Sequence, residues 1–101
     1  MRHFVYRLLP PRPTFPKDIT TEERAIMSRH VTYWRSCFSD NSLIVMGPVA
    51  DPNGTYGIAI LRLRDETDAG RLARNDPAIL ADAGFRYELC EMQGLTKDME
   101  P

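Results

Sequence analysis

The 101-residue sequence lacks the features that mark many small proteins as metal-, membrane- or nucleic-acid-binding. It has only two cysteines, Cys37 and Cys90, with neither CxxC spacing nor a nearby pair of histidines, so we expect no metal site and no disulfide scaffold. It lacks an excess of either charge, since 13 Lys and Arg oppose 14 Asp and Glu, and without a basic cluster we expect no nucleic-acid partner. No run approaches the roughly 18 consecutive apolar residues of a membrane span, and no apolar signal segment begins the chain. These absences predict a cytoplasmic protein without a membrane partner.

Motifs of several enzyme classes are also missing. The sequence has no glycine-rich phosphate loop, no HExxH and no GxSxG, which disfavours nucleotide hydrolysis, zinc proteolysis and serine-hydrolase chemistry. An enzyme with this sequence is therefore expected to use no cofactor. The sequence does contain an ordinary globular composition, with 43% hydrophobic and 27% charged residues. We predict one folded domain over residues 1–94, followed by a polar tail over residues 95–101.

The hydrophobic pattern predicts four strands and two main helices. Residues 3–9 form a first strand, and four prolines then predict a stiff, extended connection over residues 10–16. A helix capped by Thr20 or Thr21 runs to residue 37 or 38, and strands at 43–46 and 56–63 form a hairpin through the turn at 51–54. We expect Gly47-Pro48 to kink or bulge the end of the second strand. A second helix over 65–75, a short helical turn starting at Asp76-Pro77 and a last strand over 85–92 follow.

This order of elements predicts an α+β fold of the ferredoxin-like βαββαβ type, with both helices on one face of a four-stranded antiparallel sheet. The third strand is nevertheless apolar on both sides, with Tyr56, Ile58 and Ile60 pointing one way and Ala59, Leu61 and Leu63 the other. The chain has no element left to cover the second face. We therefore predict a homodimer through the open sheet face, the alternative being a monomer with a partly apolar surface.

His30 is the first candidate for chemistry. It lies on the apolar face of the first helix, whose members recur at three- and four-residue steps: Ile26, Met27, His30, Val31, Trp34, Cys37 and Phe38. A ring held there is either a core histidine, satisfied by a carbonyl or a tyrosine hydroxyl, or a general acid or base. Its position alone favours the structural role.

Asp76 is the second candidate. It precedes Pro77, where a carboxylate caps a helix by accepting hydrogen bonds from free backbone amides. The functional alternative is that Asp76 faces His30, fixes the tautomer of the ring and favours the imidazolium. The two roles are compatible, because one oxygen can cap while the other accepts from a histidine.

Aromatic residues and a proline are weaker candidates. Tyr6, Tyr33 and Trp34 either line a pocket or fill the core, and the core is the commoner place for such side chains. Pro48 belongs to the Gly47-Pro48 pair that is expected to end a strand. If the protein binds a substrate, we predict Tyr6, Tyr33, Trp34 and Pro48 as the walls of the binding site.

Taken together, His30 on the first helix, Gly47-Pro48 at the end of the second strand and Asp76-Pro77 after the second helix resemble the pattern of the YCII-related (YciI-like) family. The resemblance extends from the first strand to Met92. It implies a ferredoxin-like subunit of a dimeric α+β barrel, similar to that of muconolactone isomerases. It also implies a cleft with a catalytic histidine and aspartate, which would here be His30 and Asp76.

The resemblance also implies a class of substrate. At least one relative is linked to dehydrochlorination of a chlorinated hydroxyhydroquinone, which makes an aromatic or enolic small molecule the expected substrate. The proline-rich segment over residues 10–16 departs from the usual family pattern and puts the substrate, rather than the fold, in question.

Three functions remain open from the sequence. The first is a cofactor-independent lyase or isomerase in which His30 exchanges a proton next to a conjugated carbonyl, with Asp76 as its partner. The second is a non-catalytic module that holds a small ligand or docks on a larger enzyme. The third is a cofactor-free oxygenase on the same barrel. Whether His30 faces an open cavity or a filled core separates the first two.

Overall fold

The structure is a computed structural model, and it describes residues 1–94. The predicted polar tail over residues 95–101 lies outside the described residues. Four strands and three α-helices alternate along the chain, with a short 3₁₀-helix, η1, after the first α-helix. Their bounds are β1 Arg2–Leu9, α1 Thr21–Arg35, η1 Ser36–Phe38, β2 Leu43–Val49, β3 Tyr56–Leu63, α2 Glu66–Arg74, α3 Pro77–Leu80 and β4 Arg86–Met92.

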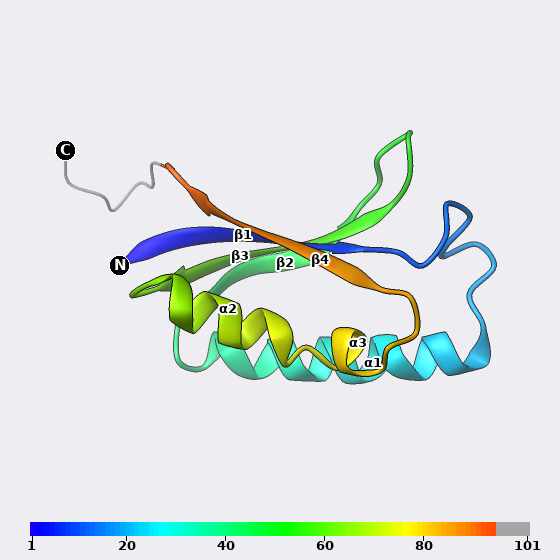
Figure 1. The fold of residues 1–101 in the computed structure, drawn as a ribbon, viewed down its shortest axis with the longest axis horizontal. Coiled ribbons are helices and arrows are strands. Elements are labelled where there is room, and N and C mark those ends of the chain that lie inside the picture. Colours follow the sequence, from blue (N-terminus) through cyan, green and yellow to red (C-terminus); the bar gives the residue numbers. More distant parts are fainter. Residues whose placement is uncertain (95–101) are drawn as a thin grey trace.

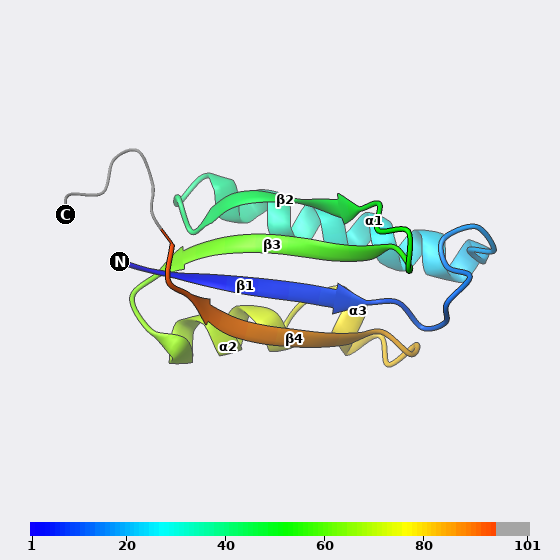
Figure 2. The same ribbon diagram turned by 90° about the horizontal axis from the view of Figure 1, so that it is seen from above.

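The strands form one antiparallel sheet in the order β2-β3-β1-β4, and the helices lie together on one face of it (Figure 1). Seen from the other side, the sheet carries no helix of the described residues (Figure 2). This arrangement confirms the predicted α+β ferredoxin-like fold. No helix within residues 1–94 is long and apolar enough to cross a membrane.

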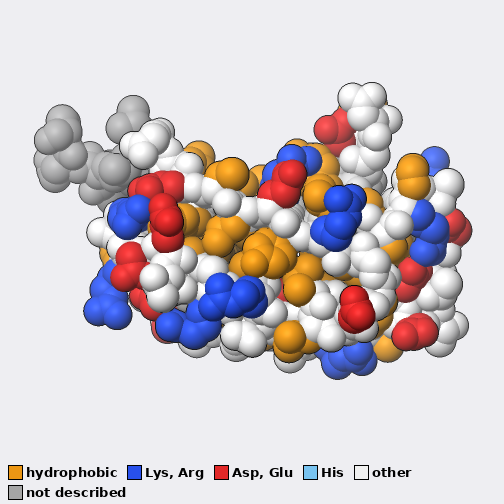
Figure 3. All heavy atoms as spheres, viewed as in Figure 1, with side chains coloured by type: hydrophobic (Ala, Val, Ile, Leu, Met, Phe, Trp, Pro, Cys, Tyr) orange, Lys and Arg blue, Asp and Glu red, His pale blue; other side chains and the backbone are white. Residues whose placement is uncertain are grey.

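Alternation along β1 determines which side chains reach the helices. Phe4, Tyr6 and Leu8 are buried, while Val5 and Arg7 point to the open face and are partly exposed. Registered partners share a face, so the buried side chains of β1 continue into Ala59 and Leu61 on β3. In the side view, charged groups of both signs are interspersed among hydrophobic ones (Figure 3).

Helix α1 begins where the sequence predicts. The Thr20 hydroxyl accepts from the Glu23 amide at 3.1 Å, and the Glu23 carboxylate accepts from the Thr20 amide at 2.9 Å, which completes a capping box. The predicted apolar face of this helix is confirmed at its centre, but the prediction is wrong for two residues at its edges. Val31 and Phe38 are 39% and 44% exposed, since they lie to the side of the line through the buried Ile26, His30, Trp34 and Cys37.

Two predictions about proline are wrong. Gly47-Pro48 neither kinks nor bulges β2, because the strand continues in register with Gly47 opposite Ile58 and Pro48 opposite Gly57. Proline is tolerated there because β2 is an edge strand, where an absent N–H removes no bond to a further strand. The irregularity in the pairing lies instead between Leu43 and Val45.

The proline-rich segment is folded rather than extended. Three turns shape residues 12–19. Their backbone hydrogen bonds run from Phe15 N to Arg12 O, from Lys17 N to Thr14 O and from Ile19 N to Pro16 O. The Arg12 side chain then binds Asp18 and Glu23, which ties these turns to the start of α1. We call residues 10–19 the proline loop. Its compactness comes from this side-chain anchor, which proline content alone does not predict.

Candidate functional site

Asp76 lies at the N-terminal end of α3, where it has no exposed surface. Its Oδ1 accepts from the Ala78 amide at 2.8 Å, and Pro77 occupies the first helical turn, so the predicted helix cap is confirmed. The cap fixes the carboxylate at the point where α3 packs against α1 (Figure 1).

Three side chains from two other elements donate to the same carboxylate. His30 Nδ1 lies 2.8 Å from Oδ2 and 2.9 Å from Oδ1, so the predicted approach of His30 and Asp76 is present in the structure. The Tyr6 hydroxyl and Trp34 Nε1 donate to Oδ2 at 2.6 Å and 2.8 Å. We call these four residues the Asp76 cluster.

The Asp76 cluster keeps its carboxylate ionised. Burial by itself raises the pKa of Asp76, but hydrogen bonds from His30, Tyr6 and Trp34 and the charge of the histidine outweigh it, so the pKa lies below its ordinary value. For Tyr6 the same contact acts in the opposite direction. Burial and the neighbouring Asp76 charge raise the pKa of the Tyr6 hydroxyl, which therefore stays protonated and remains a donor.

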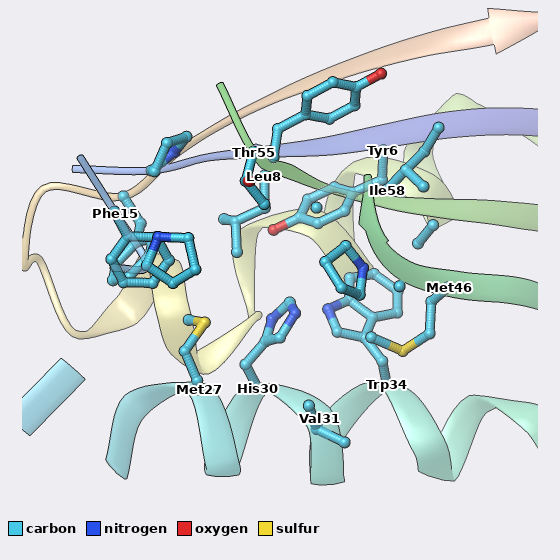
Figure 4. Close-up of a pocket in the computed structure, with 18 of the residues that line it drawn as sticks. Tyr6, Leu8, Phe15, Met27, His30, Val31, Trp34, Met46, Thr55 and Ile58 are labelled. Atoms are coloured by element: carbon cyan, nitrogen blue, oxygen red, sulfur yellow. The ribbon is translucent and has the colours of Figure 1, made fainter. Parts of the chain in front are cut away.

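The charge of Asp76 determines the tautomer of His30. An ionised carboxylate can only accept, so Nδ1 of the ring carries the hydrogen in this contact. In the neutral ring Nε2 is then the unprotonated nitrogen. His30 is 8% exposed and lines a cavity, and Figure 4 shows its ring rising from α1 beneath Tyr6. His30 therefore faces an open space and not a filled core.

The cavity has a volume of about 300 Å³ and lies between α1, the sheet and the proline loop. Apolar side chains supply most of its wall (Figure 4). They come from β1, α1, β2 and the proline loop and include Leu8, Met27, Met46, Pro48 and Phe15. Apart from its outlet to solvent, this is an apolar site with one titratable ring nitrogen available to a ligand.

The structure brings most of the predicted wall residues together. Tyr6, Trp34 and Pro48 line the cavity with His30, whereas Asp76 lies behind the histidine and does not line it. Tyr33 was predicted as a wall residue and lies elsewhere. Its hydroxyl donates to the Leu72 carbonyl at 2.7 Å, which points the ring toward α2, and burial raises the pKa of that hydroxyl to about 12.

Sequence reasoning missed two features of the site. The sequence predicts Tyr6 and Trp34 as core residues or as walls of a pocket, and not as donors to Asp76. A buried indole N–H needs an acceptor, and Trp34 follows His30 by one helical turn, so this contact had a signal in the sequence. The lining by Phe15, Pro16 and Ile19 depends on the fold of the proline loop and had no such signal.

Within residues 1–94 no three His, Cys, Asp or Glu side chains are grouped so as to hold a metal ion. Comparison with protein families identifies the YCII-related domain, whose model matches residues 4–93. The matched range contains all four strands but for the first residues of β1, together with His30 and Asp76. No curated protein matches the chain.

Proposed function

The chain belongs to the YCII-related domain family, and we propose that it is a cofactor-independent enzyme that moves a proton on an aromatic or enolic small molecule. The observation that carries this proposal is the position of His30. One ring nitrogen is held by a buried carboxylate, and the ring lines a cavity of molecular size.

Each residue then has a distinct task. His30 is the general base, because Nε2 is the nitrogen that the Asp76 contact leaves free for a substrate. Asp76 is a positioning residue that holds the tautomer and stabilises the imidazolium once the proton has moved. Such a positioned base contributes typically 10² to 10⁴-fold in rate. The remaining acceleration must come from binding and orientation in the cavity.

The proton transfer fits a lyase or an isomerase. His30 removes a proton from a carbon or hydroxyl next to a conjugated carbonyl, and the electron pair left behind enters the conjugated system. In a dehydrochlorination that pair expels chloride, and the imidazolium later releases its proton to solvent. In an isomerisation the imidazolium returns the proton to a second carbon of the same molecule. Neither route consumes an oxidant or a reductant.

A screen of hydroxyquinol-like and enol-lactone substrates tests this proposal, with His30→Gln and His3→Gln compared. His3 is the other histidine of the chain and lies on β1 facing away from the helices, so it serves as the matched control. We expect His30→Gln to lose at least about 10²-fold in turnover with its fold intact and His3→Gln to keep its activity. Equal turnover in wild type and His30→Gln would contradict the mechanism.

Asp76→Asn tests the positioning role separately. In the wild type, ¹⁵N spectra of the imidazole should show hydrogen on Nδ1 and not on Nε2. The amide removes the charge that holds this tautomer, so Nε2–H should become populated and turnover should fall. An unchanged tautomer would contradict the role of Asp76, and Asp76 would then be a helix cap and a packing residue.

A non-catalytic module remains the second candidate. The apolar cavity favours a module that binds a small ligand over one that docks on a larger enzyme, because the cavity offers a small ligand an enclosed surface. It predicts a ligand that binds without being converted. In that case His30→Gln weakens binding, and no substrate of the screen turns over.

We also propose that a second copy of the chain covers the open sheet face. Val45, Ile60 and Val5 lie side by side across three strands of this face, and Val45 is 54% exposed. Next to them Arg7 lies 4.4 Å over the Tyr56 ring and binds Glu88 at 2.9 Å. Arg7 Nε is buried and has no partner within residues 1–94. Apolar surface and an unpaired donor on one face support a two-fold interface.

The mass of the protein in solution tests this interface. Val45→Glu should convert a dimer to a monomer in sedimentation equilibrium, because it places a charge in the apolar surface that Val45 forms with Ile60 and Val5. Arg24→Glu on the outer side of α1 is the control and should leave the mass unchanged. A wild-type monomer at high protein concentration would contradict the proposal.

A further inference from the structure

Charge is absent from the wall of the cavity that His30 lines. None of the described residues that line it is Lys, Arg, Asp or Glu. The polar residues there are His30, Thr55, Tyr6 and Tyr56, but the Tyr56 ring lies against Arg7 on the open sheet face, and the Tyr6 hydroxyl already donates to Asp76. A ligand in this cavity therefore meets apolar surface and one free ring nitrogen.

The charge behind the wall disfavours an anionic ligand. Asp76 is ionised and buried on the far side of the imidazole, and its donors occupy it fully. A carboxylate or phosphate brought into the cavity would lose its water, find no Lys or Arg on the lining and lie near a second carboxylate. An uncharged ligand avoids this cost. Its proton can pass to Nε2, and the anion that results is paired with the imidazolium formed in the same step.

The size of the cavity limits the ligand in a second way. Its volume of about 300 Å³ is roughly twice that of an apolar cavity of about 150 Å³ that binds benzene. Phe15 and Phe85 meet edge to face with ring centroids 5.4 Å apart at the proline-loop end. Met27 and Met46 bring flexible thioethers to other parts of the wall. Aromatic rings and thioethers both suit a flat, unsaturated ligand.

We propose that the cavity takes an uncharged, planar, chiefly apolar molecule of one or two rings, which directs a weakly acidic O–H or C–H at His30 Nε2. The orientation of that group rests on the proposed function, whereas the exclusion of charge rests on the lining and on the buried carboxylate behind it. The site thus selects against the carboxylate and phosphate groups that most small metabolite sites bind through Arg or Lys.

A matched pair of probes tests the ligand class, namely 2-naphthol and naphthalene-2-carboxylate. Trp34 lines the cavity and is the one tryptophan of the chain, so its indole N–H signal reports binding without any turnover. We expect 2-naphthol to bind at least about tenfold more tightly than the carboxylate. Equal or tighter binding of the carboxylate overturns the proposal, and so does failure of both probes to bind.

A charge added to the wall sharpens the test. Val31 lines the cavity at a partly exposed position, so Val31→Lys can place an ammonium at its edge without burying it. Its neighbour Thr32 is exposed and does not line the cavity, which makes Thr32→Lys the control. We expect Val31→Lys to reduce the preference for 2-naphthol at least threefold, as a cation pairs with the carboxylate, and Thr32→Lys to leave it unchanged. An equal change in both variants overturns the argument from the lining.

The affinity ratio and the turnover of His30→Gln can fail independently. If the protein prefers 2-naphthol but His30→Gln keeps full turnover, the proposed function is contradicted and the proposed ligand class is supported. If His30→Gln loses turnover but the protein shows no preference between the probes, the proposed ligand class is contradicted and the proposed function is supported.

Discussion

Two polar clusters hold elements that form the cavity: the Asp76 cluster, of which Tyr6, His30 and Trp34 line it, and a cluster around the guanidinium of Arg12, which anchors the proline loop. Asp76 has no exposed surface and accepts from three side chains and one amide. The Arg12 side chain is 32% exposed and donates to Asp18 and Glu23 at distances of 2.7–2.9 Å. Both contain a charge matched by hydrogen bonds, but Asp76 binds side chains 42 to 70 positions away in the sequence, whereas Arg12 binds residues 6 and 11 positions away.

Burial makes the two clusters different. Around Asp76 each donor would lose its only partner if the carboxylate were removed, and water could not replace it. Around Arg12 solvent reaches the guanidinium and Asp18, so water can solvate both sides of that broken pair and dissolved salt screens their attraction, and only Glu23 is buried. We infer that the Asp76 cluster holds the fold and the histidine together, while the Arg12 cluster positions the proline loop, which forms one wall of the cavity.

Removal of the buried carboxylate should have the largest effect. Asp76→Ala leaves His30, Tyr6 and Trp34 without an acceptor, and we expect a loss of about 3–5 kcal/mol in the free energy of unfolding. Denaturant unfolding followed by circular dichroism measures it. Asp18→Ala in the exposed cluster is the control and should lose far less. Comparable losses would mean that burial does not separate the clusters.

Single hydroxyl deletions sharpen the comparison within the core. Tyr6→Phe removes a hydrogen bond to a buried charge and should cost about 1.5–3 kcal/mol of stability. Tyr33→Phe removes a bond to the neutral Leu72 carbonyl and should cost about 0.5–1.5 kcal/mol. Thermal or denaturant unfolding of the two variants measures the difference. A larger loss for Tyr33→Phe would contradict the special role of the Asp76 charge.

Acidification should have the smallest effect on stability, and it tests the Arg12 cluster. The Arg12 guanidinium and the Thr20 amide lower the pKa of Glu23 from 4.5 to about 2. The folded state thus binds this proton less readily than the unfolded chain, so the contribution of Glu23 is complete above pH 4.5 and is lost as the pH falls toward 2. Unfolding measured between pH 6 and 2 should show a weaker decline in Arg12→Gln. Parallel curves for wild type and variant would contradict the pairing.

The two clusters also differ in how far the sequence predicts them. The cap at Asp76 and the inward face of His30 follow from local rules, since Asp-Pro starts a helix and apolar residues recur at helical spacing. Their contact was one of two alternatives, because 46 residues separate them and only the packing of α3 against α1 joins them. The anchoring of Arg12 to Asp18 and Glu23 was missed, since proline content favours an extended chain unless a tertiary contact folds it back.

Local chemistry in the sequence determined the order of elements, the capped helix, the hairpin and the family pattern, because capping, periodicity and turn preference act over a few residues. Tertiary structure decided what each candidate side chain does. It turned Tyr6 and Trp34 into donors to Asp76, directed Tyr33 to α2 and brought Phe15 to the cavity. The physical reason is that a buried polar group takes the partners that packing delivers, and packing depends on the whole fold.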